Sequence, residues 1–249
     1  MKVGANLLSV FSSAQGEGEL IGIRQIFIRF SGCNLRCKFC DTPQAQKVTP
    51  TCKFQLSLNK RNFIETSNPL SASHLRKIVE DLNQTKHHSI SLTGGEPLLQ
   101  ARFLVKFLPL LRKRGLKIYL ETNGTLPEEL SKVISLIDFI ALDIKLPSST
   151  GERSFFTEHK RSLRIAVRKD SFVKIVITPD TLVSELKLAI NLIASEDSSI
   201  PLILQPVTPY AKVQKSPSPK RMLKFQELAL EKLDKVRIIP QMHKLIRLI

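Results

Sequence analysis

The sequence predicts an α/β fold in which a mostly parallel sheet forms an open or closed barrel. Short segments rich in Ile, Val and Phe alternate with helical patterns along most of the chain, and that alternation requires right-handed crossovers between parallel strands. Polar turns that contain Gly or Pro directly follow several of the apolar segments. With 249 residues, the chain is long enough to bury a large core in one domain.

The predicted strands and helices follow from local pattern. The strands are expected at residues 25–30, 89–92, 116–120, 139–144, 172–177, 200–204 and 236–239. Ser73 is the predicted N-cap of a helix that buries Leu75, Ile78, Val79 and Leu82. Pro97 is predicted to open a second helix that ends at Gly115. Further helices are expected at 127–135, 158–168, 181–194 and 218–233.

The domain organisation is expected to be simple, with one domain over residues 1–249. Within it, the Ser-, Asn- and Lys-rich stretch 43–70 is predicted to be a variable basic loop insertion. Residues 211–249 are predicted to supply a final helix and strand.

Composition indicates a soluble protein of a reducing compartment. The longest apolar stretches, such as 134–142, carry an Asp and are too short to cross a membrane. The first residues lack the apolar core of a secretory signal, so we expect a cytoplasmic location. Thiols stay reduced there, which argues against a disulfide framework for the four cysteines.

The net charge of +16 raises the question of nucleic-acid binding. The basic residues are spread over 47–61, 160–174 and 212–247, and they do not form one stripe with aromatic side chains. We therefore expect no specific nucleic-acid binding and a solvated basic surface that attracts small anions.

Polar segments follow the predicted strands at the point where each one ends. Thr93-Gly94-Gly95-Glu96-Pro97 follows one strand, and residues 121–124, 143–145 and 205–206 follow later ones. Because the carboxyl ends of parallel strands meet at one edge of a sheet or barrel, these segments are expected to form one site.

Three cysteines suggest the chemistry of that site. Cys33, Cys37 and Cys40 lie in a loop after the strand that ends at Phe30, and thiolates at this spacing suit zinc or an iron-sulfur cluster. A structural zinc would need a fourth Cys or His nearby, and Cys52 has no partner motif. Three ligands on a four-iron cluster leave one iron open to another ligand.

This Cys-x3-Cys-x2-Cys loop, with Phe39 before its last cysteine, resembles the signature of the radical S-adenosylmethionine superfamily. Residues 94–97 resemble the GGEP motif of the same superfamily. The resemblance implies a partial parallel β/α barrel with about six core strands. It also implies a [4Fe-4S] cluster whose open iron holds S-adenosylmethionine, from which radical chemistry begins.

Further motifs resemble one family within that superfamily, the 7-carboxy-7-deazaguanine synthases. They are residues 11–18, 26–33, 40–42, 121–125, 205–206 and 240–244. The resemblance implies a magnesium-dependent ring contraction of 6-carboxy-5,6,7,8-tetrahydropterin to 7-carboxy-7-deazaguanine with loss of ammonia, on the route to queuosine. A reductant such as flavodoxin or ferredoxin and a homodimer are also implied.

The resemblance assigns roles to residues at matching positions. Substrate binding is expected from Ala14, Gln15, Gly16, Arg29 and Thr93. S-adenosylmethionine binding is expected from Phe39, Cys40, Asp41, Gly95, Asp143, Ile144, Lys145 and Gln205. Cys33, Cys37 and Cys40 would hold the cluster and Thr42 the magnesium ion, with no side chain as acid or base. Residues 143–145 replace the Ser-Pro-Lys of some members, and the lone His243 is left out of catalysis as structural.

Two rival functions remain at this point. A glycyl-radical-enzyme activase of the same superfamily would share the cysteine spacing but need an opening for a protein. A non-catalytic iron-sulfur or RNA-binding module would bind RNA with steep salt dependence and leave S-adenosylmethionine intact.

Overall fold

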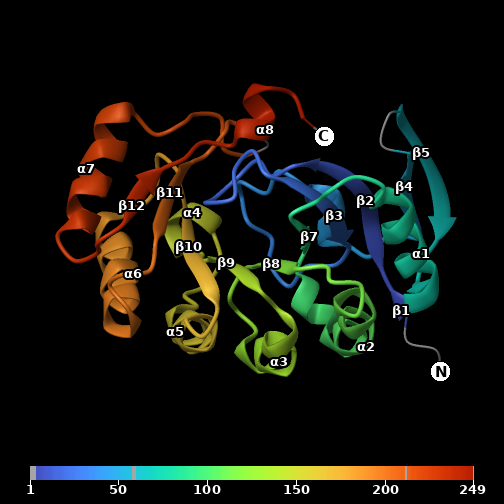
Figure 1. The fold of residues 1–249 in the computed structure, drawn as a ribbon. Coiled ribbons are helices and arrows are strands. Elements are labelled where there is room, and N and C mark those ends of the chain that lie inside the picture. Colours follow the sequence, from blue (N-terminus) through green and yellow to red (C-terminus); the bar gives the residue numbers. More distant parts are fainter. Residues whose placement is uncertain (1–3, 58–59, 211, 249) are drawn as a thin grey trace.

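A computed structural model describes residues 4–57, 60–210 and 212–248, and Figure 1 shows its ribbon. Within them, ten strands form one sheet in the order β12-β11-β10-β9-β8-β7-β3-β2-β4-β5. Strands β3 and β7 to β12 are mutually parallel. This confirms the predicted α/β class with a mostly parallel sheet.

The parallel strands agree closely with the segments predicted from sequence. They are β3 (Arg24–Phe30), β7 (Ser89–Gly94), β8 (Ile118–Thr122), β9 (Phe139–Asp143), β10 (Asp170–Ile177), β11 (Leu202–Pro206) and β12 (Val236–Ile238). Six of them, β3 and β7 to β11, form the core of the barrel, and β12 extends its edge. No helix among the described residues is long and apolar enough to span a membrane.

Helices cover the outer face of this sheet (Figure 1). They are α1 (Ala72–Leu82), α2 (Ala101–Arg112), α3 (Pro127–Val133), α5 (Phe156–Ala166), α6 (Val183–Glu196) and α7 (Pro219–Leu230). The shorter α4 (Pro147–Thr150) follows the carboxyl end of β9, and α8 (Met242–Leu245) follows β12. Three 3-10 turns, η1 (Pro43–Gln46), η2 (Pro97–Gln100) and η3 (Ile134–Leu136), complete the helical elements. The main core lies between the sheet and this layer.

The first helix begins two residues earlier than predicted. The N-cap of α1 is Ser71, whose Oγ accepts a hydrogen bond from the His74 amide at 3.2 Å, so the prediction of Ser73 was wrong. Both serines suit an N-cap chemically, and the extended backbone at residue 71 decides between them. The predicted apolar face of Leu75, Ile78, Val79 and Leu82 is buried.

The sequence did not predict the strands on the other side of β3. Strand β2 (Leu7–Ala14) pairs antiparallel with β3, and the hairpin of β4 (Thr51–Ser57) and β5 (Lys60–Ser67) continues the sheet. That hairpin occupies much of the stretch 43–70, which was predicted to be a loop. The prediction failed because Lys and Asn residues interrupt the apolar alternation of the two strands. Short β1 (Gly4–Ala5) pairs with β6 (Leu70–Ser71). Residues 212–248 contain the predicted helix and strand, α7 and β12, followed by α8.

Candidate active site

One pocket lies at the carboxyl ends of the parallel strands, and alternate strand residues line it. In β-strands, residues two apart face the same side, so Tyr119 and Glu121 of β8 point inward together. Phe172 and Lys174 of β10 repeat the pattern. Tyr119 and Phe172 pack together in an inner apolar cluster, which places the polar residue of each pair one step nearer the open end. The barrel floor is therefore apolar and its mouth is charged.

The cysteine loop covers one side of this mouth. Cys33, Cys37 and Cys40 all line the pocket and are partly buried. The Cys33 amide donates to Gln46 O at 3.2 Å, and the Cys33 Sγ accepts from the Leu35 amide at 3.4 Å. Burial raises the pKa of the Cys33 thiol and raises that of Cys37 to about 11. Three converging soft thiols fit an iron-sulfur cluster, whose positive iron would stabilise the thiolates.

Two glycines let strand β7 approach the cysteine loop closely. Gly94 has φ +111°, which L side chains rarely adopt. A Cβ atom on Gly95 would lie 2.1 Å from the carbonyl oxygen of Gly32 and 2.6 Å from that of Ala45. Because both obstacles are backbone atoms, only glycine fits at position 95.

Glu96 holds the strand ends together beneath the pocket. Its carboxylate accepts hydrogen bonds from the Leu98 amide, the Thr122 hydroxyl and the Asn123 amide at 3.0, 3.0 and 2.8 Å. Burial raises its pKa to about 7 despite these bonds. Glu96 does not itself line the pocket, and its hydrogen bonds position the loops that do.

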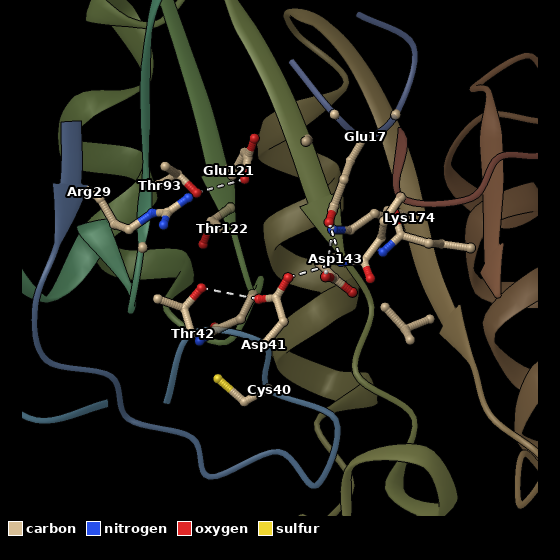
Figure 2. Close-up of a pocket in the computed structure, with 18 of the residues that line it drawn as sticks. Glu17, Arg29, Cys40, Asp41, Thr42, Thr93, Glu121, Thr122, Asp143 and Lys174 are labelled. Atoms are coloured by element: carbon tan, nitrogen blue, oxygen red, sulfur yellow. Dashed lines mark hydrogen bonds and ion pairs between the residues drawn. The ribbon is translucent and has the colours of Figure 1, made fainter. Parts of the chain in front are cut away.

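A buried charge network crosses the pocket (Figure 2). Asp143 Oδ2 lies 2.8 Å from Lys145 Nζ and 3.3 Å from Lys174 Nζ, and Lys174 also pairs with Glu17. Burial would raise the pKa values of Asp143 and Glu17. Lys145 and Lys174 hold the pKa of Asp143 below its ordinary value, and Lys174 with Gln241 does the same for Glu17. The carboxylates in turn raise the pKa of Lys174 well above its ordinary value, although burial opposes this.

Two buried oxygen atoms in this region have no hydrogen-bond partner among the described residues. They are Asp143 Oδ1 and Gln205 Oε1. Buried acceptors are rarely left unpaired, so these atoms are suited to the N–H and O–H groups of a bound molecule. The pocket residues thus fit the cluster through three thiols, and S-adenosylmethionine through two unpaired acceptors and the ammonium group of Lys145.

Opposite the network, Glu121 forms a second polar group with two predicted substrate residues. Glu121 accepts from Gln15 Nε2 at 2.8 Å and from the Thr93 hydroxyl at 2.7 Å. Burial raises the pKa of Glu121. Arg29 lies beside Thr93 (Figure 2). Its guanidinium carbon is 5.3 Å from the Phe11 ring centroid. A flat polar molecule with donors on one edge and a carboxylate on the other matches this arrangement.

The segment after β12 closes the pocket from above. Gln241 Nε2 donates to Glu17 Oε1 at 2.7 Å and to Asp41 Oδ2 at 3.0 Å. Burial would raise the pKa of Asp41, but nearby His243, Lys244 and Arg29 hold it well below its usual range. Among the described residues, Glu17, Asp41 and His243 offer ligand atoms within 4.8 Å of one another. Thr42 stands beside this group and donates to Asp41 Oδ1 at 3.1 Å.

The structure brings all but one of the predicted site residues to this pocket. The exception is Ile144, whose side chain is buried in the main core and whose amide donates to Lys174 O. Four further residues that line the pocket were not predicted from sequence, namely Glu17, Glu121, Lys174 and Gln241, and His243 was not among the predicted site residues. Glu17 and Glu121 lie within the motifs at residues 11–18 and 121–125, so their position in the sequence could have identified them as site residues. Lys174 carried none, because it sits in an ordinary apolar strand.

Comparisons with known proteins agree with this geometry. The chain matches the model of the radical SAM superfamily over residues 27–185. It is 45% identical to the 7-carboxy-7-deazaguanine synthase of Geobacter sulfurreducens over 246 residues, which cover 98% of this chain and 97% of that protein. The enzyme of the same name from Methanothermobacter thermautotrophicus is 35% identical over 260 residues, with 96% of each chain covered.

Solved structures support the same fold. The crystal structure of QueE from Escherichia coli matches with a TM-score of 0.62 at 19% identity, covering 96% of this chain and 95% of that one. A structure of TYW1 with a lysine-pyruvate adduct bound matches with a TM-score of 0.56 at 12% identity, covering 84% and 73%. These likenesses confirm the partial barrel predicted from sequence.

Proposed function

This chain is an enzyme of the radical S-adenosylmethionine superfamily and belongs to its 7-carboxy-7-deazaguanine synthase family, and we propose that it contracts 6-carboxy-5,6,7,8-tetrahydropterin to 7-carboxy-7-deazaguanine. Ammonia would be lost, and the product would enter the route to queuosine and related deazapurines. The relatives favour this function over the activase hypothesis.

One observation carries the proposal: a single pocket holds three cysteines and, beside them, a buried polar group centred on Glu121. A four-iron cluster and S-adenosylmethionine are the cofactors of the superfamily, and when bound they supply the one-electron chemistry that activates a substrate C–H bond. Cys33, Cys37 and Cys40 would hold the cluster. Gly95, Phe39, Asp41, Asp143, Lys145 and Gln205 would hold S-adenosylmethionine.

The opposite group would recognise the pterin. The Glu121 carboxylate is suited to two N–H donors of an aminopyrimidinone edge, as long as it stays ionised. Gln15 and Thr93 fix that carboxylate in place with their own hydrogen bonds. Ala14 and Gly16 would contact the ring, and Arg29 would pair with the substrate carboxylate by two parallel hydrogen bonds.

Magnesium is expected to bind together with the substrate. Thr42 is the proposed protein ligand, and one neutral oxygen holds this ion poorly without an anionic partner. In the structure the Thr42 hydroxyl donates to Asp41, so the lone pairs of the Thr42 oxygen are not used by this hydrogen bond and would be available to a cation. Waters and the substrate carboxylate would complete the shell.

The enzyme would also need an electron donor. It would act on a small molecule, draw electrons from a reductant such as flavodoxin or ferredoxin, and work as a homodimer in the cytoplasm.

The test is anaerobic reconstitution of the cluster, followed by an assay with S-adenosylmethionine, 6-carboxytetrahydropterin, magnesium and dithionite. We expect 7-carboxy-7-deazaguanine from the wild-type protein and none from Cys37→Ala. Cofactor cleavage without this product would keep the superfamily chemistry and reject the substrate, whereas a failure to bind iron would reject both.

A second variant tests substrate recognition alone. Glu121→Gln replaces one acceptor oxygen by a donor, so the KM for the pterin should rise by about tenfold or more, since a hydrogen bond to a charged group contributes about 1.5–3 kcal/mol. Iron content should not change. An unaltered KM would show that Glu121 does not contact the substrate.

A further inference from the structure

A row of hydrogen-bonded polar side chains runs along the inner wall of the barrel, below the pocket mouth. It consists of Gln15, Gln25 and Ser89, and we call it the polar chain. Only 3%, 0% and 1% of these residues is exposed. Gln15 lines the pocket, whereas Gln25 and Ser89 do not. The polar chain therefore connects a pocket residue to the part of the barrel beneath it.

The backbone determines which way the side-chain amide of Gln15 points. Gln15 Oε1 accepts from the backbone amides of Gly16 and Glu17 at 2.8 and 3.1 Å. Backbone N–H groups only donate, so the side-chain atom between them must be the oxygen. The other end is then the NH2 group, whose two hydrogens are donated to Glu121 Oε1 at 2.8 Å and Gln25 Oε1 at 3.1 Å.

The orientation of Gln25 follows from that of Gln15. Because Gln15 donates to it, the Gln25 atom on that side is the oxygen, and Gln25 Nε2 faces Ser89 Oγ at 2.9 Å. His88 Nδ1 lies 3.1 Å from Ser89 Oγ and can accept the hydroxyl proton. The two side-chain amides thus have one consistent orientation, which starts from the backbone amides of residues 16 and 17.

Gln25 belongs to the framework of the sheet, whereas Gln15 belongs to a turn. Gln25 lies within β3 and pairs with Ser13 of β2 on one side and with Ser89 of β7 on the other. Gln15 directly follows β2, and its backbone closes a turn through hydrogen bonds with residues 22 and 23. Fixing a glutamine side chain costs conformational entropy. The bond to Gln25 offsets part of that cost and anchors the Gln15 amide to the sheet.

Packing alone gives no reason for a glutamine at position 25. A buried, hydrogen-bonded amide stabilises a fold little more than an apolar side chain of the same shape, because folding also removes its hydrogen bonds to water. The next three residues of β3, Ile26, Phe27 and Ile28, are apolar and buried, so an apolar residue would suit the strand. An amide adds donors and an acceptor in fixed directions, which a neighbouring amide can use.

We propose that Gln25 is a positioning residue for substrate recognition, which orients the Gln15 amide and through it the Glu121 carboxylate. This inference rests on the proposed function, because Glu121 recognises a pterin only if the chain acts on one. Gln15 donates to Glu121 Oε1, and Thr93 donates to Oε2 (Figure 2), so both oxygens are used as acceptors. A carboxylate held in this way has lone pairs left for two N–H groups of an aminopyrimidinone edge.

The charge state of Glu121 agrees with this role. Burial raises the pKa of Glu121, and the nearby Glu17 carboxylate adds to the increase. Lys174 and the hydrogen bonds from Thr93 and Gln15 act in the opposite direction. A protonated Glu121 would present one donor and could not accept at both oxygens. By holding the Gln15 donor in place, the polar chain favours the ionised form that suits the substrate.

The experiment compares recognition of the pterin with binding of S-adenosylmethionine. Gln25→Met removes the acceptor for Gln15 and keeps a side chain of similar length. Gln226→Met is the matched control on α7, where Gln226 Nε2 donates to Val236 O far from the pocket residues in sequence. Formation of 7-carboxy-7-deazaguanine is measured with dithionite while the pterin and S-adenosylmethionine are varied in turn, and iron is quantified in every sample.

We expect Gln25→Met to raise the KM for the pterin about three- to tenfold, since a neutral hydrogen bond changes an equilibrium by about that factor. The kcat should be nearly unchanged, because the lost interaction serves binding. The KM for S-adenosylmethionine and the iron content should stay at their wild-type values, and Gln226→Met should match the wild type throughout. Ser89→Ala, which removes the acceptor of Gln25 Nε2 without enlarging a side chain, should raise the pterin KM by a smaller factor.

A double variant distinguishes orientation of Glu121 from a general loosening of the barrel. If Gln25 acts through Glu121, the pterin KM of Gln25→Met/Glu121→Gln should lie within about twofold of that of Glu121→Gln alone, because residues that act as a unit are not additive. Effects that multiply would overturn the proposal. So would a pterin KM that is unchanged in both Gln25→Met and Ser89→Ala, or a rise in the KM of both substrates in these variants. No product from the wild type would overturn the proposed function itself, and the substrate role of Gln25 with it.

Discussion

The cysteine side of the pocket is built largely from backbone, whereas the carboxylate side is built from side chains that come from distant parts of the chain. On the cysteine side, Gly95 lies against the carbonyl of Gly32, and the Cys33 amide binds Gln46 O. On the carboxylate side, Glu17, Lys174 and Gln241 meet although more than 60 residues separate each from the next. Local spacing can specify the first arrangement, but only the complete fold creates the second.

The two sides also differ in how they would respond to a ligand. Asp143 Oδ1 and Gln205 Oε1, on the side of the proposed cofactor, have no partner among the described residues. Glu17 and Glu121, by contrast, already hold several hydrogen bonds or ion pairs. A ligand can therefore supply the missing hydrogen bonds of Asp143 and Gln205. Glu17 and Glu121 are already held in place by the protein before a ligand binds.

Substituting glycine by alanine should give the largest difference in iron content and activity between the two sides of the pocket. Gly95→Ala places a methyl group against the backbone carbonyls of the cysteine loop. Gly16→Ala places one 2.1 Å from the Nδ1 atom and 2.6 Å from the Cβ atom of His243, so the closing segment must shift and the cysteine loop need not. We expect Gly95→Ala to lose bound iron and at least about a hundredfold in activity, and Gly16→Ala to keep iron and lose about tenfold. Iron content and product formation measure both. Equal iron content in the two variants would refute the backbone argument.

Removing the central cation should have the next largest effect. Lys174→Met leaves Glu17 and Asp143 buried without their shared partner, which costs about 3–5 kcal/mol of folding free energy. The exposed pair of Lys132 and Glu129 gives a matched control, since Lys132→Met should cost less than about 1 kcal/mol. Urea unfolding of the apoprotein measures both, and adding Glu17→Gln should restore part of the loss. Similar losses for the two lysines would show that the network is not effectively buried.

A pH titration should reveal the buried His159, which contacts the loops after β8 and β9. His159 Nε2 lies 3.1 Å from Asn123 O, and burial lowers the pKa of its imidazole to about 4. An unfolded histidine titrates near its ordinary value of about 6.5. Between these values the unfolded chain binds the extra proton, so stability is present above about pH 6.5 and is lost as the pH falls toward 4.

His159→Gln removes that titration. The difference in unfolding free energy between wild type and variant should therefore change by about 3 kcal/mol between pH 7 and pH 4. Taking the difference cancels Glu96 and Glu121, whose raised pKa values act in the opposite direction. A difference that is constant with pH would mean that the pKa of His159 is the same in the folded and the unfolded protein.

Much of the fold and of the cysteine side was predictable because the signals are local. Seven parallel strands appear as apolar runs, and the cysteines and the glycine turn follow them directly. Strand β2 was missed because three serines interrupt its apolar pattern, and the β4–β5 hairpin because charged residues do the same. Lys174 was missed since one lysine in an apolar strand reveals its role only when β9 and β10 align it with Asp143.

The smallest expected effect concerns Gln241, which links the closing segment to the carboxylate side. The Gln241 Nε2 atom donates to both Glu17 and Asp41. Without Gln241, Glu17 would still pair with Lys174, and Asp41 would still lie 3.6 Å from the Lys244 ammonium group. Gln241→Leu should therefore cost only about 1–3 kcal/mol, less than Lys174→Met. Gln226→Leu is the matched control, because Gln226 Nε2 donates once, to the neutral Val236 carbonyl, and its loss should cost about 1 kcal/mol. If the two glutamine variants unfold at the same urea concentration, the two Gln241 hydrogen bonds stabilise the protein no more than one ordinary hydrogen bond does. Lys174 would then be the main residue that holds the carboxylate side together.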